Sequence, residues 1–238
     1  MYNKYFVLSD NYQLYLRFIK LLEAKSLINS FDFYCSPEND IMINKGLPAL
    51  DVKKSFIDLI SKYSMGFSIH SKQMFPKELV QSIPCINIHP GYNPFNRGWY
   101  PQVFSIINDE VIGATIHFMD EKLDNGKIIE RIKVEKEIWD TSETLYLKIL
   151  NAEMILLGNN IFDIINDSTN PFEPEFLGKL YLKKDFDELC KISLNQEGRF
   201  EDFYNLLRAT TFSNYQNAFI IDEKTGKKIY ISINISYE

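Results

Sequence analysis

Three polar side chains in this sequence could together carry out acyl transfer. Asn87 and His89 lie at the end of the hydrophobic run CINIH, and Asp124 precedes an Asn-Gly turn in a separate acidic loop. An amide can donate to a developing oxyanion, an imidazole can move a proton, and a carboxylate can orient that imidazole. No Ser or Cys nucleophile is needed if the acceptor is an amine. The alternative interpretation is a capping Asn, a structural His and a turn Asp.

The residues around His89 favour a rigid strand exit. Side chains two apart on a strand point to the same side of the sheet, so Asn87 and His89 share a face. Pro90 restricts His89 to extended torsions, and Gly91 permits a sharp turn directly afterwards. We expect these restraints to hold both polar side chains at the edge of a cleft.

Hydrophobic periodicity predicts strands and helices that alternate along the first part of the chain. The expected strands are 5–10, 31–35, 66–70, 85–89, 111–120 and 127–135, and the expected helices are 15–27, 52–63, 76–82, 100–108 and 141–166. Such alternation is typical of an α/β fold with a mostly parallel sheet, in which ligands bind at the carboxyl ends of the strands. The exit after His89 is one of these ends.

The chain is expected to divide into two domains near residue 166. The stretch DSTNPFEPEF at 167–176 is rich in turn formers and predicts a linker. Two short helical patterns follow at 185–192 and 200–210, and two apolar runs within 218–235 flank a Gly-containing turn typical of a hairpin. We therefore expect a domain over 1–166 and a small helix and β-hairpin module over 167–238.

Composition excludes several classes of function. The 238 residues are 45% hydrophobic, with a net charge of -6, which argues against a nucleic-acid-binding surface. Cys35, Cys85 and Cys190 are far apart, and the three histidines show no HxH or HExxH spacing, so we expect no metal site. No apolar run approaches the roughly 20 residues needed to cross a bilayer. The sequence predicts a cytoplasmic protein without a membrane or nucleic-acid partner.

Two segments resemble the formyltransferase family that uses N10-formyltetrahydrofolate. They are NIHPGYNPFNRGWYPQVFSI and IGATIHFMDEKLDNGKII, which carry the family's Asn-x-His-Pro and Leu-Asp-x-Gly motifs. The resemblance covers most of the chain up to residue 165 and implies a Rossmann-like formyltransferase domain with N10-formyltetrahydrofolate as co-substrate. It places Asn87, His89 and Asp124 on the catalytic positions. It implies that Asn87 donates to the oxyanion, that His89 stabilises it or moves protons, and that Asp124 holds the imidazole.

Within that family, the sequence is similar to the branch that acts on nucleotide-linked amino sugars. After His89-Pro90, the methionyl-tRNA and glycinamide ribonucleotide branches usually have Ser-Leu-Leu-Pro, whereas this sequence has Gly91, Tyr92 and Asn93. The tail LLRATTFSNYQNAFIIDEKTGKKIYI also resembles the short C-terminal module of the 4-amino-sugar enzymes. The resemblance implies a dTDP-linked 4-amino-4,6-dideoxyhexose as acceptor, for a surface polysaccharide such as O-antigen. A 3-amino or other nucleotide-linked sugar, hydrolysis of formyl-folate, and a non-catalytic binding module remain open.

Candidate folate contacts lie in two loops at strand ends. The resemblance implies that these loops enclose the pterin ring, and the candidates are Gln73, Met74, Phe75, Met119, Asp120, Glu121, Lys122 and Leu123. For Met74 and Phe75, packing in the core is the alternative.

Candidate contacts to the dTDP-sugar are spread over both domains. They are Asn11, Tyr92, Arg97, Trp99, Tyr100, Arg208, Tyr215 and Asn217. Arg97 suits a bidentate phosphate contact, with a solvated ion pair as the alternative, and Trp99 can stack or wall a pocket. Asn11 follows the first strand, where free helix amides favour anions. Phe212, Tyr215 and Phe219 could instead form a homodimer interface.

The other two histidines are not expected to be catalytic. His117 lies inside an expected strand and is interpreted as a structural, hydrogen-bonded residue near the site. His70 precedes the first folate loop, and the sequence indicates no partner for it.

Overall fold

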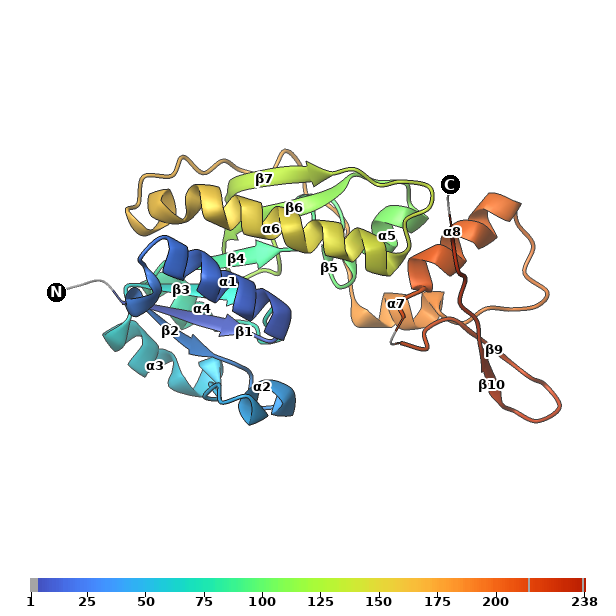
Figure 1. The fold of residues 1–238 in the computed structure, drawn as a ribbon, viewed down its shortest axis with the longest axis horizontal. Helices are drawn as coiled ribbons and strands as arrows, with labels where there is room; N and C mark the ends of the chain where they lie inside the picture. The colour runs from blue at the N-terminus through green and yellow to red at the C-terminus, as the bar shows by residue number, and fades with distance from the viewer. Residues whose placement is uncertain (1–3, 214, 237) are drawn as a thin grey trace.

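The computed structural model describes residues 4–213, 215–236 and 238. Within these residues, six strands form one mixed sheet in the order β2-β1-β3-β4-β6-β7, with helices on both faces (Figure 1). The strands are β1 (Tyr5–Ser9), β2 (Phe31–Tyr34), β3 (Met65–Ile69), β4 (Cys85–His89), β6 (Ile112–Phe118) and β7 (Ile128–Val134). The predicted α/β fold is confirmed.

The sheet has a parallel half and an antiparallel half. β1 runs parallel to β2 and β3, and β3 runs parallel to β4. β6 then returns antiparallel to β4, and β7 is antiparallel to β6. The carboxyl ends of β1, β3 and β4 therefore meet at one edge, where the candidate residues of the sequence lie.

Several of the helices begin next to a side chain that caps them. Asn11, Asp51 and Thr141 each accept a hydrogen bond from a backbone N–H in the first turn of α1, α3 and α6. The helices up to residue 165 are α1 (Tyr12–Ala24), α2 (Asp40–Asn44), α3 (Val52–Lys62), α4 (Lys77–Ser82), α5 (Pro101–Ile107) and α6 (Ser142–Ile165). The sequence did not predict α2, because it is short and lies among turn-forming residues.

Strand alternation divides the core between the two faces of the sheet. Tyr5 and Val7 belong to the larger cluster, which includes buried residues of α1 and α6. Phe6 and Leu8 point the other way, into a cluster with residues of α3 and α4. Figure 1 shows α1 and α6 on the near face. Both faces are covered, so the polar groups gather at the strand ends.

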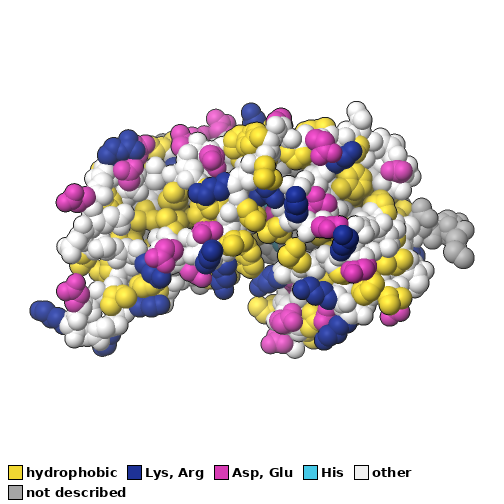
Figure 2. All heavy atoms as spheres, turned by 180° about the vertical axis from the view of Figure 1, so that it is seen from behind, with side chains coloured by type: hydrophobic (Ala, Val, Ile, Leu, Met, Phe, Trp, Pro, Cys, Tyr) yellow, Lys and Arg dark blue, Asp and Glu magenta, His cyan; other side chains and the backbone are white. Residues whose placement is uncertain are grey.

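The C-terminal part follows as short helices and a hairpin. It contains β8 (Leu180–Tyr181), α7 (Lys183–Leu189), α8 (Phe200–Thr210) and the antiparallel pair β9 (Phe219–Ile221) and β10 (Lys228–Tyr230). β8 pairs in parallel with the short strand β5 (Arg97–Gly98) of the first part. In space-filling view the surface is notched between the lobe that carries the hairpin and the rest of the molecule (Figure 2).

The stretch expected to be a linker lies along the part of the chain that precedes it. Phe172 pairs with Ile128 of β7 through two backbone hydrogen bonds, and Glu175 forms an ion pair with Arg131. A Cβ on Gly178 would lie 1.6 Å from the carbonyl oxygen of Pro94, so glycine is required for this close approach. This segment is therefore packed against the surface and is not a flexible linker, although its composition is rich in turn formers.

None of the helices in the described ranges has the length and apolarity that crossing a bilayer requires.

Candidate active site

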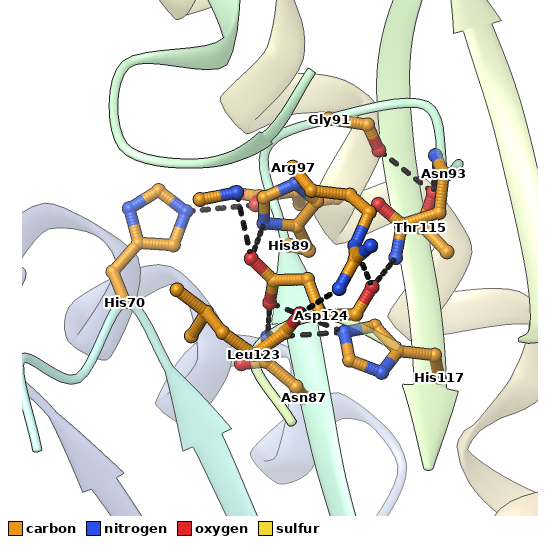
Figure 3. A network of polar contacts seen from close by, with 12 residues as sticks. His70, Asn87, His89, Gly91, Asn93, Arg97, Thr115, His117, Leu123 and Asp124 are labelled. Carbon is orange, nitrogen blue, oxygen red and sulfur yellow. Dashed lines mark hydrogen bonds and ion pairs between the residues drawn. The ribbon is translucent and has the colours of Figure 1, made fainter. Parts of the chain in front are cut away.

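The end of β4 brings the three predicted catalytic side chains together (Figure 3). The Nδ2 atom of Asn87 lies 3.0 Å from Oδ1 of Asp124 and 3.1 Å from Nε2 of His117. Nδ1 of His89 lies 3.5 Å from Oδ2 of the same carboxylate. The end of β4 and the loop that carries Asp124, which are separated in sequence, thus meet as the sequence predicts.

Asp124 is held as a carboxylate. Burial opposes its ionisation, but attraction to His89, hydrogen bonding with His117 and the backbone N–H of Gly98 hold its pKa well below the usual range. Gly98 donates to Oδ2 at 3.0 Å. Gly126 completes the tight loop, because a Cβ there would lie 1.9 Å from the carbonyl oxygen of Phe118.

His89 is neutral at physiological pH and offers a free nitrogen. Burial is the largest influence on its pKa and lowers it to about 4, against the opposing charge of Asp124. Since Nδ1 faces that carboxylate, the proton belongs on Nδ1 and the lone pair on Nε2. Nε2 is buried and has no hydrogen-bond partner among the described residues. This arrangement suits a proton acceptor.

The lowered pKa of His89 predicts a pH dependence of stability. An unfolded imidazole takes up a proton near its ordinary pKa of about 6.5, whereas folded His89 resists protonation down to about pH 4. Between these values the unfolded chain binds more protons, so the free energy of unfolding falls as the pH falls. The difference between these two pKa values corresponds to about 3 kcal/mol of unfolding free energy. We expect the His89→Asn variant to lack this loss when the free energy of unfolding is measured by urea titration at several pH values. Parallel curves for both proteins would contradict the assignment.

Gly91 is required by the position of the imidazole. A Cβ on this glycine would lie 2.4 Å from Nε2 of His89 and 2.8 Å from Cδ2. We expect Gly91→Ala to push the ring aside and lower kcat by about a hundredfold, because a misplacement of about 1 Å can cost that much. Steady-state kinetics measure this.

A matched control for Gly91→Ala is Gly198→Ala. The nearest atom to a Cβ at Gly198 is 3.4 Å away, which is ordinary contact, so turnover should not change. An equal kcat for the wild type, Gly91→Ala and Gly198→Ala would show that the His89 ring has room to move.

The position of Arg97 differs from the prediction. Its guanidinium is buried and donates to the carbonyl oxygens of Asp124 at 2.9 Å, Leu123 at 2.6 Å and Gly178 at 3.2 Å. Only 5% of the residue is exposed, so it is not available for a phosphate. Arg97 instead fixes the loop that carries Asp124.

The predicted folate contacts fall into two groups. The Gln73 side chain is engaged with Leu50, Val52 and Ser36, and Phe75 packs in the core against Phe6, which is the alternative interpretation for Phe75. In the second loop, Asp120 accepts from the Lys122 backbone N–H and from Asn125, and Glu121 contacts Lys77 and Gln81. Met74 is half exposed and Leu123 is partly buried, so their apolar side chains remain available, whereas Met119 packs against the core cluster that contains Phe6.

Several predicted sugar-nucleotide contacts have other partners. Arg208 is buried and donates to the carbonyl oxygens of Glu137 and Asp140, which docks α8 rather than offering a charge to a ligand. Asn217 donates to the Thr210 carbonyl. The Tyr92 ring faces the guanidinium of Arg131 with 4.5 Å between them. These contacts hold the fold together.

The remaining predicted contacts are more accessible. Trp99 is 37% exposed and Tyr215 is 66% exposed. Tyr100 is partly buried, its ring centroid 4.1 Å from that of Phe186. Asn11 caps α1 and also donates to Tyr146.

The structure adds residues that the sequence did not indicate. Thr115 accepts from the backbone N–H of Asn93 and donates to the Gly91 carbonyl, which holds the turn after His89. His70 contacts Glu153 and Tyr146 of α6. In the sequence, the sign of this contact is Glu153, a charged residue in a largely hydrophobic helix. Its partner His70 could not be identified, because it lies 83 residues away in the chain. In the described ranges there is no cluster of metal-ligating side chains.

Comparisons with known proteins agree with this geometry. Residues 50–161 match the formyl transferase family, and residues 185–237 match the N-formyltransferase dimerization C-terminal domain. The dTDP-4-amino-4,6-dideoxyglucose formyltransferase of Mycobacterium bovis is 39% identical over 208 residues, which are 87% of each chain. A solved 4-N formyltransferase from Francisella tularensis has a TM-score of 0.95 at 38% identity, and a sugar N-formyltransferase from a Shewanella species has 0.94 at 34%. Both comparisons cover 99% of each chain.

Proposed function

Since this chain belongs to the sugar N-formyltransferases, which formylate amino groups of nucleotide-linked sugars, we propose that its acceptor is dTDP-4-amino-4,6-dideoxyglucose. The observation that carries this choice is the 39% identity, over 87% of both chains, to a relative described as acting on that sugar. We further propose that N10-formyltetrahydrofolate is the donor and that the product serves a surface polysaccharide.

The geometry supports a direct attack of the sugar amine on the formyl carbon. Asp124 keeps the proton of His89 on Nδ1, and Nε2 accepts a proton from the attacking nitrogen and returns it to the leaving nitrogen. Asn87 donates one of its two amide hydrogens, which contact Asp124 and His117, to the oxyanion that forms. Each residue thus acts on a different atom of the tetrahedral intermediate.

The residues at the strand ends fit a folate donor. The unpartnered Nε2 of His89 requires a polar group beside it, and the formyl group with its approaching amine supplies one. Met74 and Leu123 offer apolar side chains to a flat ring. The bound folate would supply the formyl group and its N10 leaving nitrogen.

We propose a homodimer that forms through the C-terminal module. The dimerization family matches residues 185–237, and this region exposes large apolar side chains. Phe200 is 83% exposed, Leu194 79%, Ile221 56% and Ile229 49%. Of the predicted interface residues, Tyr215 is exposed, whereas Phe219 is buried within the module. Sedimentation at several concentrations tests this assembly.

Substrate choice is tested with a panel of amino sugars. The protein is mixed with N10-formyltetrahydrofolate and dTDP-linked 4-amino or 3-amino sugars, and folate release and product mass are followed. We expect turnover with dTDP-4-amino-4,6-dideoxyglucose. Turnover with a 3-amino sugar alone would contradict the proposed acceptor. Folate release without any sugar would indicate hydrolysis of N10-formyltetrahydrofolate. Tight sugar binding without turnover would indicate a binding module.

A further inference from the structure

A line of hydrogen bonds outside the cluster of Asn87, His89 and Asp124 runs from the exit of β1 to the middle of α6. Oη of Tyr146 lies 3.0 Å from Nδ1 of His70, whose Nε2 lies 2.7 Å from Oε1 of Glu153. We call these three residues the relay.

Glu153 is an unusual group to find in this position. It is 0% exposed, and its Oε2 atom has no partner among the described residues. Burial of an incompletely paired carboxylate is costly, and an apolar residue would pack better on the core face of α6. Neither the predicted nor the proposed chemistry above uses the relay. Its presence therefore requires a functional explanation.

The hydrogen bonds of the relay have one direction. The Oδ1 atom of Asn11 accepts from the Leu14 backbone N–H at 3.1 Å, so its Nδ2 is the donor to Oη of Tyr146, also at 3.1 Å. Tyr146 can then give its own proton to Nδ1 of His70, and the Nε2–H of His70 points at Glu153. Every donor points toward the carboxylate. Oη retains one acceptor position.

The relay lies beside the reaction centre. Ile69 is paired in register with Ile88, so His70 and His89 follow at the same edge of the sheet. His70 has a left-handed φ of 52°, and its ring reaches α6. Figure 3 shows the His70 ring on the side of His89. Tyr146 is half-buried, and its ring centroid lies 6.0 Å from that of Phe212 in the C-terminal module.

We propose that the relay accepts the first proton of the substrate ammonium, an inference that rests on the proposed function. An amino sugar at neutral pH is largely R–NH3+, which has no lone pair for attack. Tyr146 Oη accepts a proton from this nitrogen while its O–H bond breaks and the proton binds Nδ1 of His70. Tyr146 ends neutral, and His70 ends as an imidazolium beside the Glu153 carboxylate.

This step completes the proton balance of the reaction. The ammonium carries one proton more than the neutral amine, and the relay removes it. His89 takes the second proton from the nitrogen after attack and returns it to the leaving N10. The product is then a neutral formamide, and His70 loses its proton to solvent when the products leave.

The groups around Tyr146 favour a phenol that passes a proton on over a phenolate that holds a negative charge. Burial, followed by the nearby charge of Glu153, raises the pKa of the Tyr146 phenol, so it stays protonated. A proton on His70 lies close enough to lower the pKa of His89, which keeps the second acceptor neutral. The titratable groups that face the relay are Glu153 and Tyr146 from α6, His89 from β4, and Tyr215 from the module.

The test is the pH dependence of kcat/KM for the amino sugar in Tyr146→Phe, Glu153→Gln and His70→Gln. Near pH 6.5 we expect losses of about a hundredfold, because the ammonium has lost its proton acceptor. The losses should shrink to about threefold near pH 9.5, where the amine is already neutral in solution. Tyr146→Phe leaves the His70–Glu153 pair in place, so it tests the relay even if Glu153→Gln does not fold.

Asp163→Asn removes an exposed carboxylate from the same helix and is the matched control. It should follow the wild type at every pH. A loss by the same factor across the pH range would show that the relay residues are structural, while the proposed function would stand. If the wild-type protein formylates no amino sugar at any pH, the proposed function fails and the relay falls with it.

Discussion

His89→Asn is expected to lower kcat by about a hundred- to a thousandfold while the affinity for the nucleotide sugar changes by less than about threefold. The variant keeps a polar group of similar size but removes the lone pair that Nε2 presents. The imidazole is buried and makes no contact that would hold a nucleotide. Asn87→Ala should cost a similar factor, since it removes the amide donor. Steady-state kinetics and calorimetric titration with the dTDP-sugar measure both quantities.

The matched control for Asn87→Ala is Asn160→Ala. Asn160 donates to the Leu156 carbonyl within α6, far from the strand ends, and its loss should leave kcat unchanged. A large loss of sugar affinity in both His89→Asn and Asn87→Ala would show that these residues are structural rather than catalytic.

Arg97→Leu is expected to lower the free energy of unfolding by about 3 kcal/mol or more and to abolish most turnover. The substitution leaves the carbonyl oxygens of Leu123 and Gly178 without a donor, and the Asp124 carbonyl keeps only the Asn93 amide. Each buried unsatisfied group costs about 1–3 kcal/mol. Since two of these carbonyls belong to Leu123 and Asp124, the Asp124 carboxylate also loses its support. Urea unfolding and kinetics at a temperature where the variant is folded separate the two effects.

Two variants control for the loss of an arginine. Arg97→Lys keeps the charge but not the planar fork, so it should recover only part of the stability. Arg17→Leu removes a single exposed contact to Asn151 and should change stability by less than about 0.5 kcal/mol. If Arg97→Leu is as stable as Arg17→Leu, the three hydrogen bonds do not hold the loop.

The sequence predicts the local features of this molecule well. Periodicity indicates the strands and helices of the sheet, and the positions of Asn87 and His89 follow from the rule that residues two apart share a face. The Asn-Gly turn places Asp124 at a neighbouring strand end. These features depend on residues close together in the chain, so a single sequence contains enough information.

The features that the sequence does not predict depend on long-range contacts. Arg97 has the chemistry of a phosphate ligand, but its partners are backbone carbonyls 26 to 81 residues away. Gln73 likewise supports a loop, and Phe75 fills the core. The pairing of β5 with β8 involves only two residues in each strand, too few for periodicity to reveal. Side-chain type alone does not distinguish a binding residue from a scaffold residue.

The pairing of β5 with β8 has a consequence for the newly made protein. Gly98 donates to the Asp124 carboxylate and is paired with Tyr181, and Arg97 donates to the Gly178 carbonyl. A nascent chain that has left the ribosome only as far as residue 165 already contains Asn87, His89 and Asp124, yet lacks the strand that pairs with β5 and the Gly178 carbonyl that binds Arg97. We therefore expect the support of the Asp124 loop to be completed only late in translation.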